Sequence, residues 1–157
     1  MTVRTWFTIS AIVVVALFAA VAVRLFVPGS QGPPDIVVRV GDVRLDGAVR
    51  ESCWPQRDGA ITCEERTDTE SESHIIPAAG SMRIFVSYPA QPKRGSIVIS
   101  NGRRTVLKRK WTHNFRYSLD PGSYTLTVEA GYEPEAGTTT RPSLVYDFDF
   151  RVTRSGS

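Results

Sequence analysis

The stretch LVYDFDFRV, residues 144–152, alternates apolar and polar side chains along most of its length. One set of alternate positions is apolar throughout: Leu144, Tyr146, Phe148, Phe150 and Val152. The positions between them carry Val145, Asp147, Asp149 and Arg151. Successive side chains of a β-strand point to opposite faces, so a period of two is typical of a strand with one face in a core. The stretch therefore predicts a half-buried strand.

The same rhythm continues through much of the chain after residue 36, where no helical period stands out. Further strands are predicted at 36–40, 82–88, 96–100, 103–110, 115–119 and 124–130, with two more around the cysteines. Asn101-Gly102 is a strong signal for a two-residue hairpin turn. Seven to nine short antiparallel strands predict two sheets packed face to face, which is a mainly β fold of the β-sandwich class over 36–154.

The ten residues LDPGSYTLTV, 119–128, resemble the penultimate-strand region of immunoglobulin-like and fibronectin-III-like domains. In those domains a turn precedes a tyrosine whose hydroxyl bonds back to the backbone, and the resemblance implies this structural tyrosine-corner role for Tyr124. It implies an immunoglobulin-like antiparallel β-sandwich of the bacterial extracytoplasmic type, and nothing specific about function. Cys53 and Cys63 depart from the antibody pattern, in which distant cysteines join the two sheets.

The N-terminal segment has a different composition from the rest of the chain. From Trp6 to Val23 there is no charged residue, and after Arg24 the apolar run continues to Val27. As a helix, residues 6–27 would be about 33 Å long, which matches the ~30 Å hydrocarbon core of a bilayer. The composition predicts a transmembrane signal anchor at 6–27. A short cytoplasmic N-terminus at 1–5 precedes it, a Pro/Gly linker at 28–35 follows it, and residues 155–157 form a C-terminal tail.

Two alternatives to an anchor stay open. Ala20-Val21-Ala22 has the small-x-small form that signal peptidase recognises, so the segment would be a cleaved signal peptide. A buried core helix is the other alternative, although no second apolar helix is apparent for it to pack against. The length of the run favours the anchor, because the apolar part of a signal peptide spans about 7–15 residues.

Cys53 and Cys63 are the only cysteines, and they flank an Asp58-Gly59 turn signal. Their spacing does not match a CxxC redox motif, and two cysteines cannot supply a four-cysteine zinc site. We favour a local disulfide across a hairpin, with two reduced, buried cysteines as the alternative. Disulfides persist in oxidising compartments, so we expect a single-pass membrane protein whose C-terminal domain is outside the cytoplasm, periplasmic or extracellular. Trp54 either covers this bond or is an ordinary exposed or edge aromatic.

The formal net charge of +3 conceals two opposed groups of charges. No acid occurs between Gln91 and Leu119. The cations of that span, with one tryptophan, form a predicted interaction patch: Lys93, Arg94, Arg103, Arg104, Lys108, Arg109, Lys110, Trp111 and Arg116. Lipid head groups, an anionic envelope polymer or an acidic protein subunit suit it better than nucleic acid, which an outward-facing domain rarely meets. The alternative is a solvated edge strand that lysine and arginine protect from sheet-to-sheet pairing.

The acidic group crowds a Ser/Thr-rich segment that we expect to be a solvated loop: Glu64, Glu65, Asp68, Glu70 and Glu72. It lacks the spacing and the glycine of an EF-hand, so no metal site is predicted. His74 and His113 are the only histidines, and we expect both to be structural. No nucleotide-binding, zinc-protease or serine-hydrolase motif occurs, and Asp147 and Asp149 are expected on the solvent face. We therefore expect no catalytic residue and no cofactor.

Three classes of function follow from these features. The leading hypothesis is a non-enzymatic, membrane-anchored, extracytoplasmic interaction module, held in membrane lipid through Trp6 to Val27. It would bind another membrane or envelope protein, as an accessory subunit of a membrane complex. The alternative is a tethered or secreted domain that binds an anionic envelope polymer or a metal ion. The third is an enzyme of a type that the sequence does not reveal.

Overall fold

The computed structural model of this chain describes residues 33–56, 60–66, 72–78, 81–134 and 140–154. The chain divides into two compact units, Met1–Gln31 and Gly32–Ser157, and all the described residues belong to the second. The predicted membrane helix at 6–27, the cytoplasmic N-terminus at 1–5, most of the linker and the 155–157 tail lie outside the described residues. Within the described ranges there is no helix that is long and apolar enough to cross a membrane.

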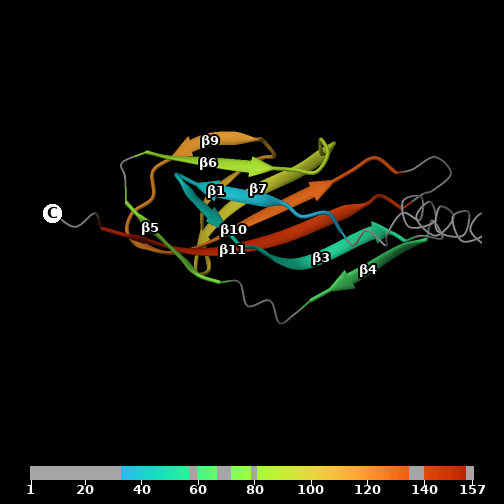
Figure 1. Ribbon diagram of the computed structural model, residues 1–157, viewed down its shortest axis with the longest axis horizontal. Helices are drawn as coiled ribbons and strands as arrows, with labels where there is room; N and C mark the ends of the chain where they lie inside the picture. The colour runs from blue at the N-terminus through green and yellow to red at the C-terminus, as the bar shows by residue number, and fades with distance from the viewer. Residues whose placement is uncertain (1–32, 57–59, 67–71, 79–80, 135–139, 155–157) are drawn as a thin grey trace, which may run out of the picture. The chain divides into compact units, whose positions relative to one another are not determined.

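Eleven strands are present in the described part of the chain, and they form two sheets (Figure 1). The smaller sheet has the order β2-β1-β6-β9, and all its neighbours are antiparallel. Its strands are β1 (Val37–Val40), β2 (Val43–Leu45), β6 (Met82–Ser87) and β9 (Asn114–Tyr117).

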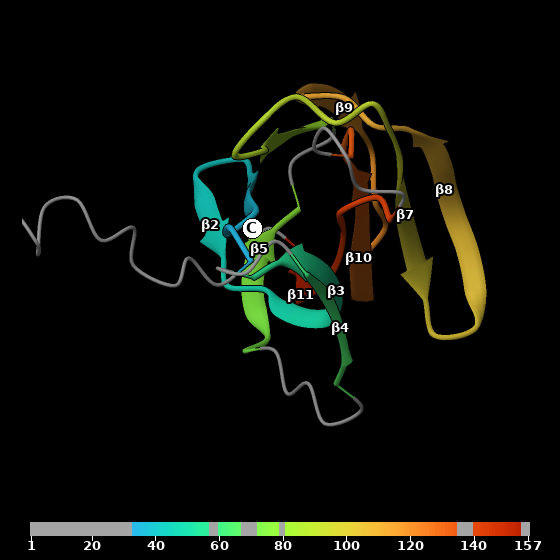
Figure 2. The ribbon, with the colours of Figure 1, turned by 90° about the vertical axis from the view of Figure 1, so that its right-hand side faces the viewer.

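The larger sheet has the order β4-β3-β11-β10-β7-β8. Its strands are β3 (Ala48–Pro55), β4 (Ile61–Glu65), β7 (Arg94–Asn101), β8 (Arg104–Lys110), β10 (Gly122–Gly131) and β11 (Ser143–Thr153). A seventh strand, β5 (His74–Pro77), pairs in parallel with the last residues of β11, beyond the part of β11 that pairs with β3. Figure 2 shows β8 beyond β7 at the edge of this sheet.

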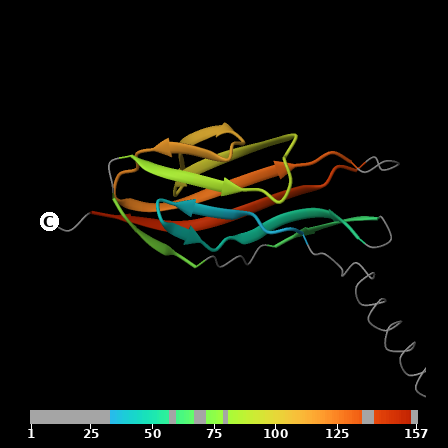
Figure 3. The same ribbon diagram turned by 45° about the horizontal axis from the view of Figure 1, so that its top comes forward.

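The two sheets lie in two layers that share one hydrophobic core (Figure 3). The five apolar residues at alternate positions of the 144–152 stretch, from Leu144 to Val152, are buried, and Phe148 is fully inaccessible to solvent. The small sheet contributes Val38, Val40, Ile84 and Val86 from the alternate positions of β1 and β6. Burial of a side chain such as Phe148 contributes about 1.5–3 kcal/mol, so the period-two pattern is the main determinant of this fold.

The prediction of a mainly β chain with two sheets is confirmed, and so is the half-buried strand at 144–152. The predicted count of seven to nine strands is wrong, because the described residues contain eleven. The missed strands are β2 and β5, which have only three and four residues and show little alternation. The expectation of purely antiparallel pairing is also wrong at β5, which runs parallel to β11.

Candidate interaction surface

The nine residues of the predicted basic patch do not form one surface. In β8, Lys108 and Lys110 lie opposite Val98 and Ser96 of β7, on the outer face of the large sheet. Arg109 lies opposite the buried Ile97 and therefore points to the core side of the sheet. Its guanidinium carbon is 4.5 Å from the centre of the Phe115 ring, a cation–π contact that covers the edge between the sheets.

The other members of the patch lie elsewhere. Arg103 and Arg104 are exposed at the β7–β8 turn, where Gly102 has a φ of 56°. Lys93 lies 3.9 Å from the Glu133 carboxylate. The three remaining members have separate surroundings: the Arg94 side chain lies over Gly131, Trp111 makes edge-to-face contacts with Tyr88 and His113, and Arg116 belongs to the small sheet.

A second group of cations gathers on the outer face of the small sheet. We call it the arginine face, and it consists of Arg39, Arg44, Arg83 and Arg116 with Phe85 among them. The burial pattern of each strand places these residues outward, between buried neighbours such as Val38 and Val40 or Ile84 and Val86. In register, Arg39 is opposite Arg44 on one side and Phe85 on the other, and Arg83 is opposite Arg116.

The charges of the arginine face lack counterions among the described residues. None of its four arginines makes an ion pair there, although Asp42 in the β1–β2 turn is also exposed. Like charges directly opposite each other on neighbouring strands are destabilising, and this face has two such pairs. Phe85 is 41% exposed and is one of two large apolar side chains exposed in the described part of the chain; Ile75 is the other.

The outer face of the large sheet is different, because it carries both signs of charge and its central acids, Asp147, Asp149 and Glu129, are bonded within the sheet. Only at its β3–β4 edge do two exposed acids, Glu51 and Glu65, lie directly opposite each other. The carboxylate of Asp147 accepts a hydrogen bond from the Thr127 hydroxyl at 2.6 Å and lies 3.1 Å from Nη1 of Arg50. Arg50 is the extra residue of a β-bulge, since the register between β3 and β11 shifts at this point. Thr125 donates to Asp149 at 2.6 Å, and Ser96 donates to Glu129 at 2.7 Å.

A second bulge ties the two sheets together beside the basic hairpin. The register between β7 and β8 shifts between Ile99 and Ser100, which leaves Val106 without a partner in the ladder. The Val106 carbonyl instead accepts a hydrogen bond from the Tyr117 hydroxyl of β9 at 2.9 Å. This bond joins the edge of the large sheet to the edge of the small sheet.

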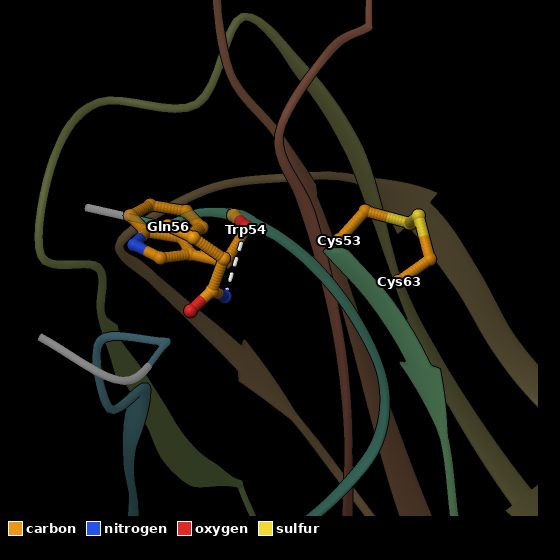
Figure 4. Close-up of a disulfide and its surroundings, with 4 residues drawn as sticks. All are labelled: Cys53, Trp54, Gln56 and Cys63. Atoms are coloured by element: carbon orange, nitrogen blue, oxygen red, sulfur yellow. Dashed lines mark hydrogen bonds between the residues drawn. A yellow bond between two sulfur atoms is a disulfide. The ribbon is translucent and has the colours of Figure 1, made fainter. Parts of the chain in front are cut away.

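Cys53 and Cys63 form the predicted disulfide, and the reduced alternative is wrong. They occupy directly opposite positions of the antiparallel β3–β4 pair, with their Cα atoms 4.0 Å apart. Trp54 does not cover the bond, because adjacent strand residues point to opposite faces; Figure 4 shows its indole away from the two sulfur atoms. The indole instead packs edge-on against Tyr132, with ring centres 5.6 Å apart.

The other predicted residues have structural surroundings. The Tyr124 hydroxyl donates a hydrogen bond to the Asp120 carbonyl at 2.8 Å, the type of bond that the resemblance implies. Nε2 of His74 accepts from the Asp46 amide at 3.2 Å, and His113 packs against Tyr88 and Trp111. No group of three metal-binding side chains occurs among the described residues.

The acidic segment is only partly a loop. Glu64 and Glu65 belong to the edge strand β4, which corrects the expectation that both lie in a solvated loop. Both are exposed, as is Glu72, while positions 68 and 70 lie outside the described residues. The β4 edge of the large sheet is therefore acidic, and the β8 edge is basic.

A shallow hollow of about 430 Å³ lies on the outer face of the large sheet, where β7, β10 and β11 present small residues. Arg94 and Lys108 line it, and Gly95 contributes to its floor. A Cβ atom at position 95 would lie 2.2 Å from the Glu129 carbonyl oxygen, so only glycine allows this approach of the strands. The hollow brings together two cations from the predicted patch.

The arginine face was not predicted from the sequence, although each of its residues is visible in the pattern. Each arginine occupies the outward position of a strand, and Arg39, Arg83 and Arg116 lie within predicted strands. The missing information was which strands are neighbours, because residues 39 and 116 meet on one face only through the β1-β6-β9 order.

Comparisons with family models, with curated protein sequences and with solved structures return no match for this chain.

Proposed function

We propose that this chain is a non-enzymatic interaction module, anchored in a membrane by residues 6–27 and folded outside the cytoplasm as an immunoglobulin-like β-sandwich. In this role it is an accessory subunit that binds another membrane or envelope protein. The apolar composition of 6–27 supports the anchor. The Cys53–Cys63 disulfide supports an oxidising compartment, because such bonds are rare where thiols are kept reduced.

Two features support the immunoglobulin-like class. Two sheets share one core, and the Tyr124 hydroxyl bonds back to the chain four residues upstream. The disulfide across the β3–β4 edge of one sheet and the parallel strand β5 distinguish this chain from antibody domains.

The arginine face is the observation that carries the proposed function. Four exposed arginines without ion pairs among the described residues share one sheet face with an exposed phenylalanine, which has Arg39 directly opposite it on one side and Asn114 on the other. Arginine and aromatic residues are enriched in the centres of protein interfaces, where they supply most of the binding energy. A solvated face with no binding role is expected to mix both signs of charge, as the outer face of the large sheet does.

Co-purification from membranes tests this function. The full-length chain, tagged at its C-terminus, is extracted in a mild detergent and its mass is measured under native conditions. We expect a stoichiometric complex with a second polypeptide that survives extraction. A homogeneous free monomer at every detergent and salt concentration would contradict the proposal.

A second candidate is supported by the β8 edge, where Arg104, Lys108 and Lys110 are exposed. These cations suit a tethered domain that binds an anionic envelope polymer. Binding of the full-length chain to a heparin-like polysulfate, with affinity that falls steeply as salt is added, would favour it. Loss of that binding in a Lys108→Glu/Lys110→Glu variant would assign it to this edge.

A further inference from the structure

We infer that the arginine face binds a carboxylate-bearing face of a partner protein, with Phe85 as the central apolar contact. This inference rests on the proposed function and names the partner's chemistry. The alternatives are a phospholipid surface, a sulfated or phosphorylated polymer and a second copy of this chain. Each of these alternatives predicts a different result in the cross-linking and charge-reversal experiments.

The choice of cation points to oxygen anions that are held in fixed positions. All four cations of the face are arginines, whereas the β7–β8 region mixes arginine with Lys93, Lys108 and Lys110. A guanidinium presents a rigid fork of donors that matches a carboxylate or a phosphate in a bidentate arrangement, and lysine presents only a flexible point charge. A surface that served diffuse attraction alone would have no need of this geometry.

The position of Phe85 argues for a protein and against a lipid or polymer. It is opposite Arg39 and two residues from Arg83 in the same strand, so cations flank it in two directions. Binding to a lipid surface scales with the apolar area that is inserted, and Phe85 is the one large exposed apolar side chain that this face offers among the described residues. A sulfated polymer offers anions but no apolar group between them. A protein strand or helix with an apolar residue between acids offers both within one contact.

The spacing of the face defines the partner more closely. Neighbouring strands are about 4.8 Å apart, and same-face residues along one strand are about 7 Å apart. Carboxylates that match this grid occur at alternate positions of a strand or on neighbouring strands. Strands of three to six residues in a four-stranded sheet cover roughly 19 Å by 13 Å, well under the ~800 Å² per partner of a stable interface. This face alone is therefore a weak contact in solution. We propose that tethering in one membrane raises the effective concentration of the two proteins, and that the predicted anchor at 6–27 adds the contacts that hold the complex together in a mild detergent.

A photo-reactive side chain at the centre of the face tests this inference. Phe85 is replaced by p-benzoylphenylalanine in the full-length chain, in the membranes of the cells that make it, and the sample is irradiated. We expect a cross-link to a polypeptide other than this chain, at a segment that has Asp or Glu around an apolar residue. The matched control carries the same photo-reactive residue at Ile75, which is also exposed but lies in β5 of the other sheet, and should give no such product.

Charge reversal then separates the arginine face from general positive charge. We expect Arg39→Glu/Arg83→Glu to lower the cross-linking yield at position 85 at least about tenfold, because like charges then face each other across the contact. The matched pair Lys108→Glu/Lys110→Glu makes the same change of net charge on β8 and should alter the yield by less than about twofold. Reversal of an acid in the cross-linked segment to arginine should restore the product with Arg83→Glu. Thermal unfolding of each variant verifies that it folds.

Several results would overturn the inference. They are a cross-link to lipid, a cross-link to a second copy of this chain alone, an equal yield at positions 85 and 75, and an equal effect of the two charge-reversed pairs. The proposed function is judged separately by co-purification of the unmodified chain. A stoichiometric partner that cross-links away from Phe85 would support the interaction module and contradict the arginine face as its binding surface. The absence of any partner would contradict the interaction module itself.

Discussion

The two sheets of this protein present outer faces of opposite character. On the large sheet, Asp147 lies between Thr127 and Arg50, and Glu129 is held by Ser96. On the small sheet, Arg39 faces Arg44 and Arg83 faces Arg116, with no ion pair to any described residue. Both faces lie over the same core, so burial does not account for the difference. The central acids of the large sheet already have partners within that sheet, whereas a face with only one sign of charge gains from meeting the other sign.

Loss of the disulfide across the β3–β4 edge of the large sheet should have the largest effect on stability. A Cys53→Ala/Cys63→Ala variant loses a bond that closes a loop with a sequence separation of 10. The lost restraint on the unfolded chain should lower the free energy of unfolding by about 2–3 kcal/mol. Urea unfolding of the variant, compared with the oxidised parent, measures this difference.

The same variant bears on the comparison of the faces. The arginine face lies on the other sheet and should keep its cross-linking yield in the cysteine-free protein at temperatures where that protein is folded. Complete loss of binding in folded, cysteine-free protein would show that the two regions are coupled.

The bonded face should lose stability when one of its acids is removed. Asp147→Ala leaves the half-buried Thr127 hydroxyl without its acceptor, and we expect a loss of about 1–2 kcal/mol. Arg50 is 44% exposed, so its ion pair contributes little of this, and Arg50→Ala should cost under about 1 kcal/mol. Chemical denaturation of both variants measures the two values. Equal losses would mean that the ion pair, and not the hydroxyl bond, holds this face.

Two buried tyrosines extend the comparison to polar groups with and without a hydrogen-bond partner. Tyr124→Phe removes a hydroxyl that bonds to Asp120 and should cost about 1 kcal/mol. The Tyr132 hydroxyl is buried with no hydrogen-bond partner among the described residues, so Tyr132→Phe should cost nothing or stabilise. Thermal unfolding at neutral pH compares the two variants, and a larger loss in Tyr132→Phe would contradict this view.

The pH dependence provides an independent check on Tyr132. Burial, followed by the nearby Tyr146, raises the pKa of Tyr132 from 10.0 to about 12. Above pH 10 the unfolded chain loses this proton while the folded chain keeps it, so the stability contributed by the neutral tyrosine falls as pH rises from about 10 to 12. The fall should be smaller in Tyr132→Phe. Tyr146 has a pKa raised to about 12 for the same main reason and leaves a residual dependence.

The part of the fold that alternation encodes could be predicted from the sequence. In the 144–152 stretch the five apolar residues at alternate positions are all buried, because a slip by one residue would expose all five of them. Strands β2 and β5 could not be predicted in this way. Their three and four residues are too few to show a period. The pairing of β5 with β11 also depends on contacts far away in sequence, whereas β2 pairs with its neighbour β1 across the Gly41-Asp42 turn.

The sequence shows the residues of the candidate site, but it does not show which of them share a surface. A run of cations from Lys93 to Arg116 looks like one surface along the chain, yet adjacent residues such as Lys108 and Arg109 point to opposite faces of a strand. The arginine face instead unites residues as distant as Arg39 and Arg116 through the strand order of the small sheet. Strand order is set by the packing of the whole core and is not a local property of any segment.

Charge reversal at two positions of the arginine face should give a small gain in stability. Arg44→Glu places a carboxylate opposite Arg39, and Arg116→Glu places one opposite Arg83. Each change turns a repulsive cross-strand pair into an attractive one and should raise the free energy of unfolding by about 0.2–1 kcal/mol. Arg44→Gln and Arg116→Gln are the matched controls; they remove the repulsion alone and should give a smaller gain. In 1 M salt the gains should shrink, because the screening length falls to about 3 Å. If the same variants unfold more easily than the parent, the arginines serve the fold. If they are more stable and yet lose the cross-link at position 85, the arginines lower stability for the sake of binding.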